Sequence, residues 1–113
     1  IDRQVHADSS LRAIELGAGL GSVGIFLAQH KGLDVVVTDQ PEAMSLLERN
    51  VGMNSEGKRL KAHPLVWGDP AQLKALGSFD LVVGSDVTYR PDCLDELLGS
   101  IRQLLRPGGR AFL

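Results

Sequence analysis

A glycine-rich segment near the start of the chain has the residue types and the spacing of a ligand-binding loop. It covers residues 14–24, IELGAGLGSVG, and passes directly into an apolar run. This order predicts a strand, a tight loop and a helix. Glycines at this spacing let the backbone turn, let a ligand lie against main-chain atoms and let the helix pack closely on the strand. We therefore expect a ligand site at a helix N-terminus, with Gly17, Gly19 and Gly21 around the ligand.

The acidic residue Glu15 bears on which ligand this loop holds. Gly19-x-Gly21-x-x-Gly24 also fits the dinucleotide fingerprint, which is weak evidence by itself. Glu15 lies near the carboxyl end of the predicted strand, so a pyrophosphate at the loop would face a carboxylate, and like charges in a partly desolvated site repel each other. A ligand with an ammonium group and no phosphate would be attracted instead. S-adenosylmethionine is such a ligand, and we favour it over a nicotinamide or flavin dinucleotide.

Strands and helices alternate along the rest of the chain. Strands are expected at residues 11–16, 34–38, 60–67, 79–85 and 110–113, and helices at 22–30, 41–51, 71–76 and 92–105. The second strand is β-branched and almost continuously apolar, as is typical of a parallel strand covered on both faces. Alternating elements imply a parallel sheet with right-handed crossovers. The predicted fold class is α/β, a Rossmann-like three-layer sandwich with a mostly parallel sheet.

Polar residues follow the predicted strands at their carboxyl ends, where open parallel sheets bind ligands. Asp39 lies about 20 residues past the glycine loop and could accept hydrogen bonds from both ribose hydroxyls of an adenosine; alternatively, it caps the following helix. Asp69, with the amides beside it, is expected at the adenine edge. Trp67 either packs near the base or fills the core. Ser85 and Asp86 follow the fourth strand, and the alternative for Asp86 is another helix cap.

The bulk properties predict one domain in a reducing compartment. The chain has 113 residues, a net charge of -2 and a single cysteine, which excludes an internal disulfide framework. No apolar run approaches the roughly 20 residues that span a bilayer, no basic patch indicates nucleic acid, and the histidines lack metal-ligand spacing. We expect a partial domain over residues 1–113, with 1–12 as a lead-in, cut from a longer protein. Its expected location is the cytoplasm, with the nucleus as the alternative.

Taken together, these residues resemble the class I S-adenosylmethionine-dependent methyltransferases. Residues 15–21 resemble their motif I, and Asp39 resembles their acidic ribose-binding residue. Residues 14–19, 37–39, 66–68 and 79–89 are similar to the methyltransferase-like protein lysine methyltransferases of family 16, whose Asp-x-x-Tyr motif matches Asp86 to Tyr89. The resemblance covers residues 13–113. It implies a seven-stranded sheet, of which this chain would lack the last two strands.

The resemblance implies a protein-lysine N-methyltransferase that uses S-adenosylmethionine and a protein substrate. Asp86 and Tyr89 would be the catalytic residues that place the lysine amine. The expected cofactor-binding residues are Glu15, Gly17, Gly19, Gly21, Asp39, Trp67, Asp69 and Ser85. Two other functions stay open: an NAD-type oxidoreductase, favoured by the glycine pattern, and a non-catalytic methyltransferase-like domain, against which the intact Asp86 and Tyr89 argue. Small-molecule, nucleic-acid and N-terminal amine substrates also stay open.

Overall fold

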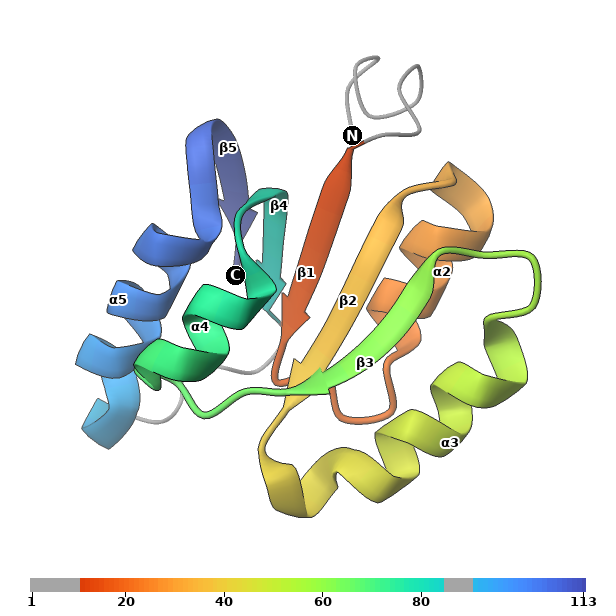
Figure 1. The fold of residues 1–113 in the computed structure, drawn as a ribbon, viewed down its shortest axis with the longest axis horizontal. Coiled ribbons are helices and arrows are strands. Elements are labelled where there is room, and N and C mark those ends of the chain that lie inside the picture. The colour runs from red at the N-terminus through yellow and green to blue at the C-terminus, as the bar shows by residue number, and fades with distance from the viewer. Residues whose placement is uncertain (1–10, 85–90) are drawn as a thin grey trace.

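A sheet of parallel strands forms the centre of the computed structural model, which describes residues 11–84 and 91–113 (Figure 1). The strands are β1 (Arg12–Leu16), β2 (Asp34–Asp39), β3 (Leu60–Pro64), β4 (Phe79–Gly84) and β5 (Leu105–Phe112). The helices are α2 (Ser22–Lys31), α3 (Met44–Asn54), α4 (Pro70–Leu76) and α5 (Leu94–Leu104), with 3-10 turns η1 (Pro41–Ala43) and η2 (Pro91–Cys93). The expected alternation of strands and helices is confirmed.

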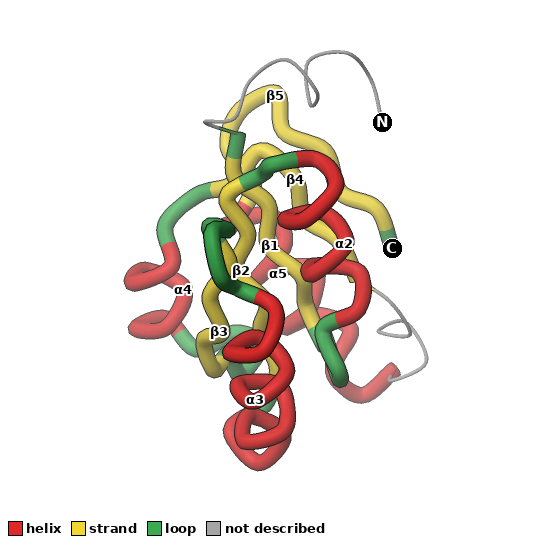
Figure 2. The backbone as a smooth tube through the Cα atoms, turned by 90° about the vertical axis from the view of Figure 1, so that its right-hand side faces the viewer, coloured by secondary structure: helices red, strands yellow, loops and turns green. Residues whose placement is uncertain are grey.

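Helices cover both faces of the sheet. Figure 2 shows the strands between α4 on one side and α2 on the other. Successive residues of a strand point to opposite faces, so β1 sends Ile14 to a core shared with α4 and α5, and Ala13 to a core shared with α2 and α3. On β2, Val36 likewise belongs to the core shared with α4 and α5, and Val37 to the core shared with α2 and α3. This explains why the central strands are almost continuously apolar.

The strand order is β3-β2-β1-β4-β5, with each neighbouring pair parallel. The chain moves outward from β1 through β2 to β3 and then returns to the other side of β1. The order therefore reverses between β1 and β4, where Leu16 pairs with Gly84 at the carboxyl ends. Open α/β sheets bind their ligands outside such a reversal. The predicted Rossmann-like sandwich is confirmed.

Two strand boundaries differ from the prediction by three residues or more. The third strand ends at Pro64 rather than Trp67, because the chain turns after it: the Val66 N–H donates to the Gln72 side chain and the Asp69 N–H to the Val66 carbonyl. The fifth strand begins at Leu105, before the predicted start. Its register against β4 is irregular. Leu105 pairs with Phe79 and Arg110 with Leu81, so four residues of β5, 106–109, lie opposite a single residue of β4. The Pro-Gly-Gly sequence therefore interrupts the pairing without preventing it.

Candidate functional site

The glycine loop between β1 and α2 has the backbone conformation that its composition predicted. Gly17, Gly19 and Gly21 have φ angles of +62°, +60° and +85°, in the left-handed region that side chains with a Cβ rarely enter. The Gly21 N–H closes a turn on the Ala18 carbonyl at 2.9 Å, and the Ala18 N–H donates to the Thr38 carbonyl at 2.8 Å. The loop is thus fixed against the end of β2.

Gly24, the last glycine of the pattern, allows α2 to pack directly on the sheet. A Cβ built at this position would lie 2.2 Å from Val37 Cγ1 and 3.1 Å from Glu15 Oε1. The Gly24 N–H donates to Glu15 Oε1 at 2.9 Å. A larger residue would push the first turn of α2 away from β2 and break the contact with Glu15.

Glu15 lies beneath the loop, and its side chain contacts the helix. The residue is 2% exposed, and its carboxylate accepts the N–H of Gly24. Burial raises the pKa of Glu15 to about 7; the hydrogen bond from Gly24 opposes the increase, and the charge of Asp39 adds to it. A contact between Glu15 and a cofactor stays a prediction, but its part in fixing the α2 N-terminus follows from this geometry.

Asp39 connects the end of β2 to the glycine loop. Its Oδ2 accepts the Gly19 N–H at 2.8 Å, and its Oδ1 accepts the Gln40 N–H at 2.8 Å. Gln40, not Asp39, is the N-cap of the following η1, and its side chain makes no cap hydrogen bond. Asp39 is half-buried. The carboxylate therefore reaches across to the loop that was predicted to hold the ligand.

The turn after β3 lies beside Asp39, because the Leu65 N–H donates to the Asp39 carbonyl at 2.9 Å. Asp69 caps α4, with its Oδ1 accepting the Gln72 N–H at 3.0 Å. Trp67 is half-buried and packs against the core shared by α4 and α5. Both residues lie at the carboxyl edge of the sheet, each with a structural contact, and their contact with adenine stays a prediction.

The predicted residues Ser85, Asp86 and Tyr89 lie outside the described residues. β4 ends at Gly84, paired with Leu16, so the chain enters that segment beside the glycine loop. Residues 11–84 and 91–113 contain no cluster of three or more potential metal ligands. In the same ranges, no helix combines the length and the apolar composition needed to cross a membrane.

Sequence reasoning missed Ser100 on α5. This side chain is fully buried, and its Oγ accepts the Gly68 N–H at 2.8 Å. The available signal was a polar residue on the apolar face of an amphipathic helix, beside Leu97, Ile101 and Leu104. The partner could not be found from the sequence, because the two residues are 32 positions apart.

The parallel sheet, the reversal between β1 and β4 and the glycine loop tied to Asp39 define an α/β domain of the nucleotide-cofactor-binding class. Comparison with known families is more specific. The family model described as lysine methyltransferase matches residues 2–113, so the chain belongs to the lysine methyltransferase family.

Curated relatives agree with this assignment. "EEF1A lysine methyltransferase 3" of Mus musculus is 41% identical over 103 residues, covering 90% of this chain and 44% of that protein. "Protein N-lysine methyltransferase METTL21A" of Danio rerio is 38% identical, covering 82% and 44%. "Calmodulin-lysine N-methyltransferase" of Arabidopsis thaliana is 32% identical, covering 84% and 33%. The chain spans less than half the length of these relatives.

Solved structures share the fold. The glycopeptide N-methyltransferase MtfA, crystallised with S-adenosyl-L-homocysteine, has a TM-score of 0.72 at 20% identity, over 96% of this chain and 46% of that one. An O-methyltransferase family protein from Burkholderia thailandensis has a TM-score of 0.77 at 21% identity, over 95% and 32%. At these identities the likeness concerns the fold alone.

Proposed function

We propose that the full-length protein transfers methyl groups from S-adenosylmethionine to lysine side chains of a protein substrate. Membership of the lysine methyltransferase family supports this reaction. The names of relatives that are 32–41% identical describe lysine methylation of proteins. We place the protein in the cytoplasm, or alternatively in the nucleus, because a single free cysteine fits a reducing compartment.

One observation carries the choice of cofactor: carboxylates accept one N–H group of the glycine loop and one of the first turn of α2. Gly19 donates to Asp39, and Gly24 donates to Glu15. In dinucleotide-binding loops, N–H groups at the helix N-terminus face the pyrophosphate. Here a pyrophosphate would lose these donors and meet the negative charge of Asp39, to which Glu15 adds when it is ionised. S-adenosylmethionine has no phosphate and carries two cationic groups, so it suits this loop better than a dinucleotide.

The space and the acceptors at the loop fit this cofactor. A Cβ built on Gly19 meets no atom of the described residues within 4 Å, so the loop is open above this glycine. Each oxygen of Asp39 accepts one N–H and retains a second lone pair that a ribose hydroxyl can use. We assign Trp67 and Asp69 to the adenine side, since both follow β3 at the same edge of the sheet, and Ser85 to the same site after β4.

S-adenosylmethionine supplies a methyl group already activated by the sulfonium. The protein must therefore align the lysine amine, exclude water and keep the amine unprotonated. We assign the placement of the amine to Asp86 and Tyr89, on the resemblance of Asp86-Val87-Thr88-Tyr89 to the family motif. Because the chain leaves β4 beside the glycine loop, this segment begins at the edge where the cofactor is expected.

A methyl-transfer assay on the full-length protein tests this function. The protein is incubated with tritiated S-adenosylmethionine and cell lysate, and labelled bands are analysed by mass spectrometry. We expect methyl-lysine in a protein band, with less label for Asp86→Ala and Tyr89→Phe. Label confined to nucleic acid or small molecules, or no label at all, would contradict the proposal.

A further inference from the structure

A buried serine on α5 contacts the turn that follows β3. Ser100 is 0% exposed and lies on the apolar face of the helix. Its hydroxyl donates to the Glu96 carbonyl at 2.8 Å and accepts the Gly68 N–H at 2.8 Å. The hydroxyl therefore has a partner both as a donor, within α5, and as an acceptor, in the turn.

Gly68 lies close to α5 as well as being hydrogen-bonded to it. Its φ is +88°, and a Cβ built on it would lie 3.3 Å from Glu96 Cγ and 3.4 Å from Glu96 Cβ. Such a contact is tight, so a side chain at position 68 would displace the turn from the helix. The contact fixes the turn against the first two turns of α5, where Glu96 and Ser100 lie one helical turn apart.

The same turn is fixed by two other elements. The Leu65 N–H donates to the Asp39 carbonyl at the end of β2, and the Val66 N–H donates to Gln72 Oε1 on α4 at 2.7 Å. Residues 65–69 are thus held by β2, α4 and α5 together. Trp67 and Asp69, the residues assigned to adenine, lie on either side of Gly68 in this segment.

We propose that Ser100 is a positioning residue for the cofactor: its hydroxyl holds residues 67–69 where the adenine binds. This inference rests on the proposed function. Removing the hydroxyl takes away the acceptor of the Gly68 N–H, so the turn loses this hydrogen bond to α5.

The test compares variants of the full-length protein that differ by one hydroxyl. Ser100→Ala keeps the helix, since alanine is the best helix former. Ser100→Thr restores a hydroxyl at the same position. Ser45→Ala, at an exposed position of α3, is the matched control. The readouts are the Kd of S-adenosylmethionine by calorimetry, its KM and kcat, and the fluorescence of Trp67, taken as the difference from the Trp67→Phe background.

We expect Ser100→Ala to weaken cofactor binding about five- to tenfold in Kd and KM, the scale of one lost hydrogen bond. We expect kcat at saturating cofactor to stay within about twofold, because the reacting groups are not touched. Trp67 emission should shift in the ligand-free variant. Ser100→Thr should restore both properties, and Ser45→Ala should change neither.

Three results would overturn the inference. An unchanged Kd in Ser100→Ala, beside normal binding by the wild type, rejects Ser100 as a positioning residue and leaves the proposed function intact. Failure of Ser100→Thr to restore binding assigns the loss to packing. Absence of S-adenosylmethionine binding by the wild type rejects the proposed function and this inference together.

Discussion

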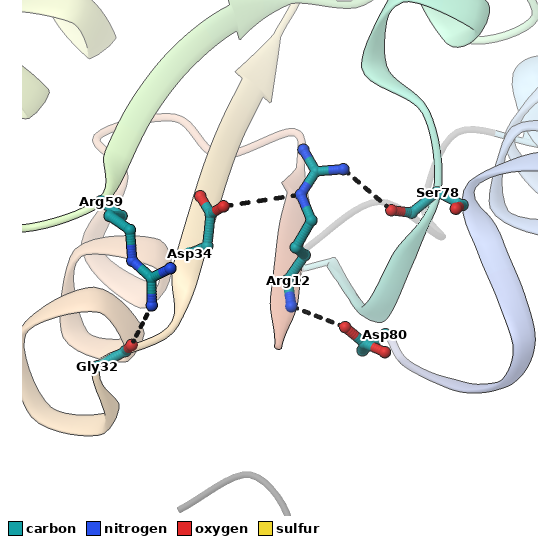
Figure 3. Close-up of polar contacts among 6 residues, drawn as sticks. All are labelled: Arg12, Gly32, Asp34, Arg59, Ser78 and Asp80. Carbon is teal, nitrogen blue, oxygen red and sulfur yellow. Dashed lines mark hydrogen bonds and ion pairs between the residues drawn. The ribbon is translucent and has the colours of Figure 1, made fainter. Parts of the chain in front are cut away.

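The two edges of the sheet use their carboxylates differently. At the amino-terminal edge, Arg12 on β1 pairs with Asp34 on β2 at 3.8 Å, and its backbone N–H donates to Asp80 on β4 at 2.8 Å (Figure 3). Arg106 on β5 forms an ion pair with Asp80. At the carboxyl edge, Asp39 instead accepts the N–H of Gly19 in the glycine loop, and Glu15 accepts the N–H of Gly24 in the first turn of α2.

We infer from this difference that the amino edge contributes to stability, whereas the carboxyl edge contributes to ligand binding. The amino edge connects neighbouring strands through arginines, and Arg12 also lies 4.3 Å from the centre of the Phe79 ring and donates to the Ser78 carbonyl. Its charges are balanced within the sheet. The carboxyl edge holds negative charge that backbone dipoles stabilise and that a cationic ligand can still use. Mutations at the amino edge should therefore leave cofactor binding unchanged, whereas mutations at the carboxyl edge should affect it.

The largest effect is expected at Gly24. Gly24→Ala places a Cβ 2.2 Å from Val37 Cγ1, and we expect it to destabilise the fold by about 3 kcal/mol, at the high end of overpacking, and to weaken cofactor binding. The matched control is Gly99→Ala on α5, where nothing lies within 4 Å of the new Cβ and a gain of about 0.5–1 kcal/mol is expected. Urea unfolding of both variants measures this; equal effects would show that α2 is not tightly packed.

The next effect is a pH dependence from Glu15. Its pKa is about 7 in the folded protein against an ordinary 4.5, so the folded state binds a proton more tightly than the unfolded state. Wild-type stability should fall as the pH rises from about 4.5 to about 7 and then level off, by roughly 3 kcal/mol at most. Glu15→Gln should remove this slope. The unfolding free energies of both proteins, measured at several pH values in that window, test this prediction. Parallel curves for the two proteins would refute the assignment of the slope to Glu15.

The amino edge should affect stability alone. Asp80→Ala removes the partner of Arg106 and of the Arg12 N–H, and we expect a loss of about 2 kcal/mol of unfolding free energy, as for hydrogen bonds to charged groups. The affinity for S-adenosylmethionine should stay the same, because the cofactor is expected at the opposite edge. A large change in affinity would remove the distinction between the edges.

Asp39→Ala should have the reverse profile. It removes the acceptor of the Gly19 N–H and the proposed ribose contact, so S-adenosylmethionine binding should weaken by at least ~1 kcal/mol. Asp39→Asn retains one acceptor oxygen without the charge, so an intermediate loss separates hydrogen bonding from electrostatics. Calorimetric titration measures both variants. Wild-type affinity in Asp39→Ala would exclude the ribose role.

The sequence predicted the elements well because local patterns specify them. The apolar run of β2, the glycines after β1 and the periodic leucines of α5 each gave the correct element. The boundaries of β3 and β5 depended on contacts between distant segments. Val66 is apolar but leaves the sheet, because Gln72 on α4 accepts its N–H.

The site was predicted less completely for the same reason. Asp39 was selected by its spacing from the loop, and its contact with Gly19 confirms that the two lie together. The burial of Glu15 against Gly24 was not predicted, since it depends on how closely α2 packs on β1 and β2. Neither the Ser100 contact nor the Asp80 pairs could be read from the chain, because the strand order brings these residues together.

Calorimetric titration of the full-length wild-type protein with S-adenosylmethionine and with NAD tests the central claim most directly. The occupied N–H groups of Gly19 and Gly24 predict saturable binding of S-adenosylmethionine and no binding of NAD at the same concentrations. Saturable binding of NAD without binding of S-adenosylmethionine would contradict the account.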